Sequence, residues 1–198
     1  MWNARYSTEE YVYGTTPNDF LLEMSHYIKG ANVLCLAEGE GRNAVYLARE
    51  GYNVFAVDAS VVGLEKAENL ADESYVNINI QVADLADYEI APETWDGIVS
   101  VFCHLPPKVR KALHRKVVAG LKPGGVLILE AYHPKQLTFK TGGPPEAALM
   151  MSLDELKEEL DGLEFYHDAE LDREVSEGRL HTGIGAVVQL VAIKPLSA

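Results

Sequence analysis

One segment, VLCLAEGEGRNAVYLA at residues 33–48, limits the possible folds more than any other part of the chain. An apolar run leads into Gly39-Glu-Gly41, and a helical pattern follows. An uninterrupted apolar run is typical of a strand that is buried on both faces of a parallel sheet. The glycines let a ligand approach the backbone, and the start of the helix offers unpaired N–H groups. The segment therefore predicts a strand, a turn and a helix that receive a nucleotide-like ligand.

The alternation of apolar runs and helical patterns continues along the chain. Further strands are predicted at 53–57, 77–82, 95–102 and 126–132, and helices at 18–29, 42–50, 61–72 and 106–119. Two longer strands, 163–175 and 179–192, flank Ser176-Glu-Gly178, which is a hairpin signal. We therefore expect an α/β fold, a doubly wound, mostly parallel seven-stranded sheet with helices on both faces and a C-terminal antiparallel hairpin.

Shorter signals complete this prediction. Lys122-Pro-Gly-Gly125 indicates a turn, and residues 138–145 indicate a loop. Ser60 is placed to cap the helix over 61–72, and Ser152 and Glu155 have the spacing of a capping box.

The composition narrows the classes of partner. A length of 198 residues favours a single domain over 1–198, in which residues 1–30 form an N-terminal extension or lid. The net charge of −13 argues against nucleic acid and against anionic membrane surfaces. The chain shows no membrane-length apolar run and no signal-peptide pattern, so a cytoplasmic protein is expected. Cys35 and Cys103 are expected to be buried thiols, and no metal-ligand spacing is present.

Two aspartates lie at predicted strand ends close to the glycine turn. Asp58 ends the second strand, where a carboxylate accepts hydrogen bonds from both ribose hydroxyls. Asp84 ends the third strand, where it can accept from the exocyclic amine of adenine. An NAD-type turn prefers a third glycine where this chain has Ala44. The turn alone therefore leaves NAD and S-adenosylmethionine open, while the end of the chain lacks a second nucleotide-binding half.

Five parts of the sequence, Val33–Ala48, Asp58, Ala83–Leu85, Trp95–Phe102 and Leu121–Leu129, resemble the class I S-adenosylmethionine-dependent methyltransferases. The resemblance implies a Rossmann-like methyltransferase fold, S-adenosylmethionine as cofactor and methyl transfer to a small molecule. It also implies a set of cofactor-binding residues: Glu38, Gly39, Gly41, Arg42, Asn43, Asp58, Ala59, Asp84, Leu85, Phe102 and Tyr13.

The opening residues 5–18, together with Gly39–Asn43, resemble more narrowly a bacterial branch near the tellurite-resistance and thiopurine methyltransferases. This likeness suggests a thiol or a chalcogen oxyanion, such as tellurite or selenite, as acceptor.

The chain departs from this family in the glycine turn. The family usually has an acid at the position of Cys35 and often glycine at that of Ala37. We hypothesise that Glu38, three residues after Cys35, supplies the missing negative charge toward the amino group or sulfonium of the cofactor.

The acceptor side of the site is expected from residues at the same edge of the sheet and in the flanking segments. The candidates for substrate binding are His104, His133, Arg179, His181 and Arg5. Arg179 and His181 would share one face of the last strand and form a cationic pair. The sequence names no catalytic residue, because an already activated methyl group requires a base only when the acceptor carries a proton.

Three other functions remain open on the sequence. An NAD(P)-dependent oxidoreductase would need a second nucleotide half and a Tyr-x-x-x-Lys pair, which the chain lacks. A non-catalytic adenosyl-binding module would explain the departures at Cys35 and Ala37. Methylation of protein or nucleic acid is a further possibility, and the acidic charge weighs against nucleic acid.

Overall fold

A single seven-stranded sheet forms the centre of the computed structural model, which describes residues 2–196. The strands are β1 (Asn32–Leu36), β2 (Asn53–Asp58), β3 (Asn79–Val82), β4 (Trp95–Val101), β5 (Leu121–Tyr132), β6 (Glu164–Glu177) and β7 (His181–Ile193). Their order is β3-β2-β1-β4-β5-β7-β6. The strands β1 to β5 are parallel, and β7 lies antiparallel to both of its neighbours, β5 and β6. The predicted fold class is confirmed.

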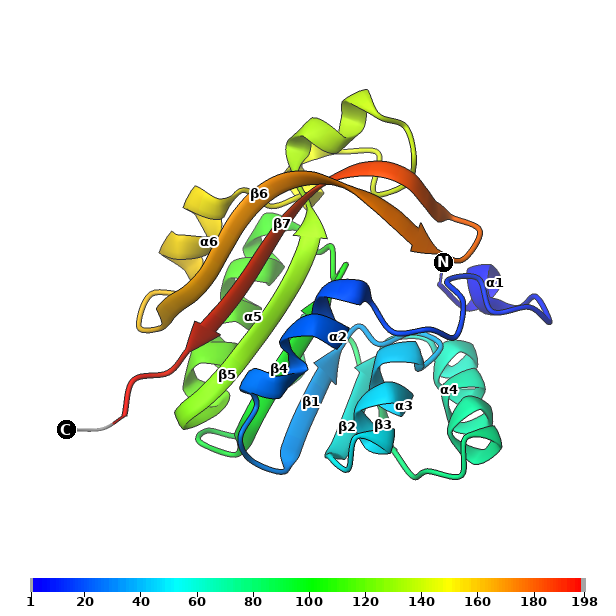
Figure 1. The fold of residues 1–198 in the computed structure, drawn as a ribbon, viewed down its shortest axis with the longest axis horizontal. Coiled ribbons are helices and arrows are strands. Elements are labelled where there is room, and N and C mark those ends of the chain that lie inside the picture. The colour runs from blue at the N-terminus through cyan, green and yellow to red at the C-terminus, as the bar shows by residue number, and fades with distance from the viewer. Residues whose placement is uncertain (1, 197–198) are drawn as a thin grey trace.

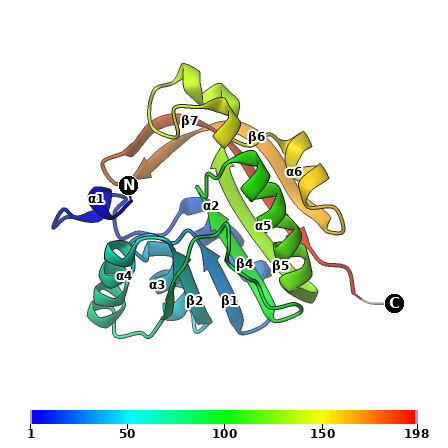
Figure 2. The same cartoon turned by 180° about the vertical axis from the view of Figure 1, so that it is seen from behind.

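Helices cover both faces of the sheet, as Figures 1 and 2 show. On one face lie α2 (Asp19–Met24), α3 (Arg42–Arg49) and α4 (Val61–Glu73), whose apolar side chains share a core cluster with β1 and β2. On the other face lie α5 (Pro107–Gly120) and α6 (Leu153–Glu159). Two-sided burial explains why β1, β4 and β5 read as continuous apolar runs.

The predicted capping residues are confirmed. The Ser60 hydroxyl accepts a hydrogen bond from the Gly63 N–H at the start of α4. Ser152 and Glu155 form a reciprocal capping box at the start of α6.

Two predicted boundaries were wrong. The helix expected over 18–29 ends at Met24 and continues as the 3₁₀ turn η1 (Ser25–Tyr27). The turn expected at 122–125 is an irregularity inside β5. Trp95 of β4 pairs with Leu121, but Gly97 pairs with Val126, so β5 has three extra residues here.

The β6–β7 hairpin extends beyond the sheet. The last β5 pair joins Tyr132 to Val187, so β7 begins six residues before it meets β5. In Figure 1 this free part arches over the carboxyl ends of the strands toward the N-terminal segment with α1 (Trp2–Tyr6). The Arg179 N–H donates to the Val12 carbonyl at 3.0 Å, which ties the tip of the hairpin to that segment.

The remaining elements are the 3₁₀ turns η2 (Pro134–Thr138) and η3 (Ala147–Leu149), which lie in the connection between β5 and α6. Among the residues the structure describes, no helix has the length and apolar character of a membrane span.

Candidate functional site

The glycine turn between β1 and α3 has left-handed backbone at three positions. The φ angles are 52° at Ala37, 62° at Gly39 and 90° at Gly41. A Cβ on Gly41 would lie 2.5 Å from the Ala67 side chain, so Gly41 is required for packing α3 against α4. The predicted role of Gly41 in the close approach of a ligand stays a prediction. Gly39 remains the position where backbone without a side chain faces the edge of the sheet.

Glu38 lies under the turn and caps α3. Its Oε1 accepts hydrogen bonds from the backbone N–H groups of Asn43 (3.0 Å) and Ala44 (2.8 Å). Burial raises the pKa of Glu38 to about 7, against the lowering effect of these bonds and of Arg42. The Glu38 side chain therefore satisfies the helix start, which differs from the predicted contact with a cofactor.

Cys35 lies beside Glu38 and is fully buried. Burial, followed by the charge and a hydrogen bond of Glu38, raises the pKa of the Cys35 thiol. Cys35 is thus a neutral thiol, and Cys103 is likewise buried with a pKa raised to about 12, chiefly by burial. Both match the expected buried, reduced cysteines.

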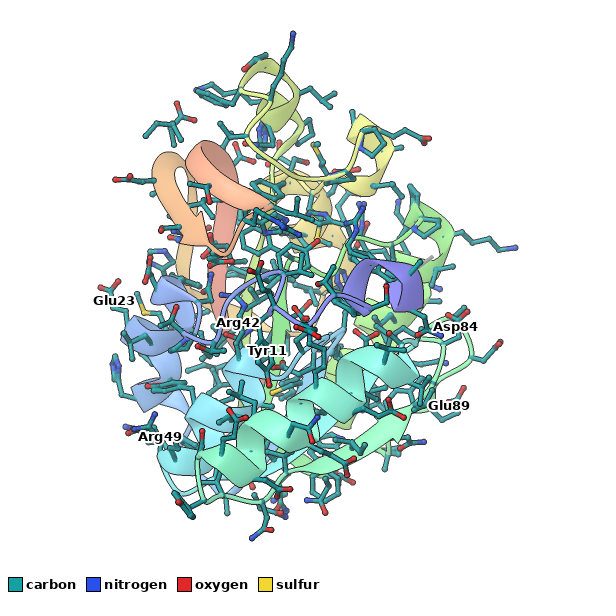
Figure 3. The ribbon with its side chains drawn as sticks, turned by 90° about the vertical axis from the view of Figure 1, so that its right-hand side faces the viewer. Tyr11, Glu23, Arg42, Arg49, Asp84 and Glu89 are labelled. Atoms are coloured by element: carbon teal, nitrogen blue, oxygen red, sulfur yellow. The ribbon has the colours of Figure 1, made fainter. Side chains whose placement is uncertain are left out.

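Asp58 and Asp84 stand at the ends of β2 and β3 as predicted. Asp58 accepts from the N–H groups of Gly39 (2.9 Å) and Ser60 (2.8 Å), and burial raises its pKa. Asp84 is exposed and uses one carboxylate oxygen to accept from the Ala86 N–H. It lines a pocket of about 330 Å³, and Figure 3 shows it near Glu89 at the margin of the molecule.

The residues that follow these aspartates differ in their exposure. Ala59 is exposed beside Asp58 and remains accessible to a ligand. Leu85 is buried in the core that β4 and α5 share, so its side chain is turned away from the pocket. Since its side chain packs into the core, only the backbone of Leu85 is left for the predicted contact with the cofactor, which stays a prediction.

The N-terminal segment lies over the glycine turn. A Cβ on Gly39 would come within 2.7 Å of the Tyr6 hydroxyl, and one on Gly63 within 3.0 Å of the Tyr6 ring. Tyr6 is buried, and its pKa is raised by burial and by the charge of Asp58. A nucleotide that enters above Gly39 therefore meets the Tyr6 side chain first.

Two charged residues anchor this segment. Glu40, inside the glycine turn, accepts hydrogen bonds from the N–H groups of Val12 (2.8 Å) and Tyr13 (3.3 Å). Lys66 of α4 pairs with Glu40 and donates to the carbonyls of Thr8 and Glu10. The middle residue of the Gly-Glu-Gly turn thus holds the segment in place.

Arg42 and Asn43 use their side chains inside the protein. Arg42 donates to Glu177 at 2.6 Å, and Asn43 accepts from the Asn18 N–H at 2.9 Å. Asn18 in turn donates to Glu177 at 2.7 Å. Both side chains join α3 to the hairpin and to the start of α2, and the predicted cofactor role of the two residues stays a prediction. Arg42 lies near the centre of the view in Figure 3.

Aromatic rings gather beyond the ends of β4 and β5. Phe102 stacks on Tyr132 with centroids 4.6 Å apart, and His181 meets the Phe102 ring edge-to-face at 4.9 Å. Tyr13 covers His181 from the N-terminal segment at 4.6 Å. Phe102 has a φ of 51°, an unusual angle for a bulky residue and a sign of a constrained site. We call Tyr13, Phe102, Tyr132 and His181 the aromatic cluster.

Tyr13 therefore lies with the acceptor-side candidates, whereas the resemblance implied a contact with the cofactor. Arg5, predicted for substrate binding, donates to the Tyr13 hydroxyl at 3.0 Å and lies over the Trp2 ring. Arg5 thus reaches the edge of the aromatic cluster.

His104 lies beside the aromatic cluster, stacked near Tyr132 at 5.7 Å. Its Nδ1 is 3.0 Å from the Leu149 carbonyl, and its Nε2 accepts from the Tyr132 N–H at 3.4 Å. Burial lowers the pKa of His104 to about 4. With both nitrogens occupied by backbone groups, His104 is a neutral, structural histidine next to the site.

His133 and Arg179 do not join this group. The His133 Nδ1 accepts from the Lys135 N–H, and its Nε2 faces Glu170 at 3.6 Å in a separate pocket against the hairpin. Arg179 lies in the hairpin turn, is exposed and faces Glu10 at 3.8 Å. The predicted cationic pair of Arg179 and His181 was wrong, because β7 begins only at His181 and the two-residue period does not apply.

Sequence reasoning placed Tyr6 only within the N-terminal lid and missed several other residues of this site, namely Asn18, Glu40, Lys66, Tyr132 and Glu177. Tyr132 could have been found, since it directly precedes His133 at the end of a predicted strand. The others act through contacts between distant segments, which no local pattern reveals.

Comparison with known proteins bears directly on this site. Residues 33–125 match the family model described as "Methyltransferase domain". The match runs from β1 to the glycine pair inside β5 and so includes the glycine turn, Asp58 and Asp84. The sheet is a methyltransferase fold.

Two curated proteins are similar in sequence to part of this chain. A tRNA (uracil(54)-C(5))-methyltransferase from Pyrococcus abyssi is 28% identical over 57% of this chain and 26% of its own length. A carboxy-S-adenosyl-L-methionine synthase from Photobacterium profundum is 33% identical over 42% of this chain and 35% of its own length. The chain thus spans about a quarter to a third of these two relatives.

Solved structures with the methyltransferase fold match nearly the whole chain. TehB from Haemophilus influenzae superposes with a TM-score of 0.73 at 21% identity, over 98% of this chain and 65% of that one. A protein solved in work on the conversion of a disulfide bond into a thioacetal group during echinomycin biosynthesis has a TM-score of 0.78 at 17% identity, over 100% and 91%. At these identities the likeness establishes the fold.

Proposed function

We propose that this protein transfers a methyl group from S-adenosylmethionine to a small-molecule acceptor. The observation that carries the proposal is the match of residues 33–125 to the methyltransferase domain, because it covers the three strand ends that bear the glycine turn, Asp58 and Asp84. In a doubly wound sheet these carboxyl ends form the ligand-binding edge.

The residues present fit this cofactor. Asp58 keeps carboxylate lone pairs for the ribose hydroxyls beside its two backbone bonds, and exposed Asp84 lies at a pocket suited to adenine. Bound S-adenosylmethionine supplies an activated methyl group. The protein's own part is to orient the acceptor and exclude water, for which the aromatic cluster and the covering N-terminal segment are suited.

The acceptor is proposed to be a small thiol or a chalcogen oxyanion such as tellurite or selenite. The likeness to TehB, and to a neighbour studied for a disulfide-to-thioacetal conversion, supports a sulfur or chalcogen acceptor. Near the aromatic cluster Arg42 is paired with Glu177, whereas Arg5 donates to the Tyr13 hydroxyl and has no carboxylate partner among the described residues. A thiol would meet the aromatic rings there and an oxyanion would meet Arg5, so both acceptors stay in the proposal.

Residues 1–30 are proposed to act as a lid within a single domain of residues 1–198. The contacts of Tyr6 with Gly39 and of Lys66 with Glu10 support a segment that covers the cofactor side of the site. Removing the first sixteen residues should clearly weaken the binding of S-adenosylmethionine, while the melting temperature should fall only slightly. Loss of the fold without a specific loss of binding would contradict the lid.

Titration calorimetry with S-adenosylmethionine, S-adenosylhomocysteine and NAD tests the cofactor. We expect the first two to bind and NAD not to bind, since within residues 2–196 the chain continues after β5 as the β6–β7 hairpin and not as a second nucleotide-binding half. Asp58→Asn should weaken S-adenosylmethionine binding by about tenfold or more, as expected for a lost charged hydrogen bond. Asp72→Asn, which makes the same change at an exposed position on α4, should leave binding unchanged.

Binding of NAD alone would overturn the proposal in favour of an oxidoreductase. Binding of S-adenosylmethionine without methylation of any thiol, selenite, tellurite, phenol or nucleic-acid probe would favour a non-catalytic adenosyl-binding module. Methylation of tRNA would favour the activity named for the Pyrococcus abyssi relative.

A further inference from the structure

His181 is the one member of the aromatic cluster with an imidazole ring, and no hydrogen bond to either of its nitrogens is found within residues 2–196. Its Nδ1 is buried and has no hydrogen-bond partner within residues 2–196. The ring lies between Tyr13, Phe102 and Tyr132, with centroid distances of 4.6, 4.9 and 5.2 Å. It contrasts with His104, whose two nitrogens are both held by backbone groups.

Glu177 sets the orientation of this ring. Glu177 and His181 are paired residues at the two ends of the hairpin turn, and the carboxylate Oε2 lies 4.0 Å from Nδ1. Burial would raise the pKa of Glu177, but contacts with His181 and Arg42 lower it to about 2. The carboxylate is therefore ionised, and its negative charge favours the tautomer with the proton on Nδ1. The lone pair is then on Nε2, on the opposite side of the ring.

Burial is the main reason that His181 is neutral. It lowers the pKa of His181 from the ordinary value, Glu177 opposes this, and the charges of Arg42 and Arg5 lower the pKa further. Glu177 comes from β6, Arg42 from α3 and Arg5 from α1, while His104 lies in the loop after β4 and Tyr132 ends β5. A neutral imidazole at neutral pH is able to accept a proton at once.

We propose that His181, oriented by Glu177, takes the proton of an acceptor that reaches the site uncharged, an aromatic hydroxyl or thiol. The proposal rests on the proposed methyltransferase function and deepens it. The O–H or S–H bond breaks and its proton moves to Nε2. A bond forms between the acceptor atom and the methyl carbon, and the carbon–sulfonium bond breaks with its electron pair on sulfur. The imidazolium then releases its proton to water.

The walls of the site support an aromatic acceptor. Phe102 and Tyr132 stack on each other and Tyr13 lies against His181, so a flat apolar body at the edge of this cluster would meet aromatic surface. Arg42 is paired with Glu177, whereas Arg5 at the edge of the cluster donates to the Tyr13 hydroxyl and has no carboxylate partner among the described residues. Phenol and thiophenol are suitable probes of this chemistry.

Two-dimensional ¹H–¹⁵N NMR of the imidazole nitrogens tests the orientation without a substrate. We expect His181 to be neutral at pH 7 with its proton on Nδ1, and Glu177→Gln to raise the share of the Nε2–H tautomer. The signals of the exposed His26 should be the same in both proteins. A His181 that is charged at pH 7, or that carries its proton on Nε2 in the wild type, would overturn the proposal.

Methylation kinetics test the base itself. His181→Phe keeps the aromatic packing but has no proton acceptor, so kcat/KM for phenol should fall about 100-fold or more. For 4-nitrophenol, assayed at a pH where it is ionised, the fall should be less than about threefold. The residual rate of the variant on phenol should rise with pH in step with ionisation of phenol, whereas the wild-type rate should level off below pH 7. His26→Gln serves as the matched control.

The outcomes separate this proposal from the proposed function. No binding of S-adenosylmethionine would overturn the proposed function. If S-adenosylmethionine binds, three results would overturn the role of His181. The first is an equal loss of kcat/KM on phenol and 4-nitrophenol in His181→Phe, and the second is no loss on phenol. The third is a wild-type protein that methylates neither phenol nor thiophenol. Circular dichroism and the calorimetric Kd of S-adenosylmethionine should be unchanged in His181→Phe, and a collapse of either assigns the residue to the fold instead.

Discussion

Arg42, the first residue of α3, donates a 2.6 Å hydrogen bond to Glu177, the last residue of β6. Both side chains are buried, so the pair joins the helix after the glycine turn to the tip of the hairpin. The two elements that border the candidate site on opposite sides are thereby held together by one ion pair.

Removing one partner of this pair should be more damaging than removing both. Arg42→Met leaves the Glu177 carboxylate buried without its main cation and should cost about 3–5 kcal/mol in the free energy of unfolding. The double variant Arg42→Met/Glu177→Gln should cost less, because no uncompensated charge remains. Urea denaturation measures both. If the double variant is the less stable of the two, the pair is not the electrostatic unit described here.

The backbone at Ala37 gives a second prediction. A φ of 52° is unfavourable for alanine by roughly 1–2 kcal/mol, and glycine adopts it freely. Glycine also gains entropy in the unfolded chain, and this offsets part of the relieved strain. Ala37→Gly should therefore stabilise the protein by no more than about 1 kcal/mol. Ala44→Gly, in the helical backbone of α3, should destabilise it by about 1 kcal/mol or more. Equal effects of the two changes would show that the strain at Ala37 is negligible.

Sequence patterns predicted the sheet well because its strands are buried on both faces. The runs at β1, β4 and β5 are apolar without interruption, and only strands of a covered parallel sheet need such composition. Asp58 and Asp84 were found for a related reason, since polar residues that interrupt a strand pattern mark the edge of the sheet.

The site was predicted less completely, because its side chains are arranged by distant contacts. Nothing in Gly39-Glu-Gly41 shows that Glu40 binds the backbone of Val12, or that Glu38 turns inward to cap α3. Arg179 was placed in a strand because the hairpin turn was assigned two residues too early. The register of a hairpin is set by its turn, and a small shift there changes which side chains share a face.

The raised pKa of Glu38 leads to a pH-dependent stability. An acid with a folded pKa near 7 binds more protons in the folded state than in the unfolded state, where its pKa is about 4.5. Its contribution to stability is therefore largest below about pH 4.5 and is lost as the pH rises toward 7. Glu38→Gln should flatten this part of the stability curve by an amount on the order of 2 kcal/mol. Chemical denaturation at several pH values compares the two proteins, and parallel curves would contradict the assignment.

The contact between the hairpin tip and the N-terminal segment depends on Gly178. Its φ is 63°, and a Cβ there would lie 2.3 Å from the Val12 carbonyl oxygen. Gly178→Ala should therefore separate the two segments and speed amide hydrogen exchange over residues 2–16. Gly51→Ala is the matched control, because Gly51 has a φ of 94° but no atom within 4 Å of an added Cβ. It carries a similar backbone penalty without the collision, so its exchange in residues 2–16 should equal that of the wild type. Faster exchange there in both variants would mean that general destabilisation, not the lost contact, frees the segment.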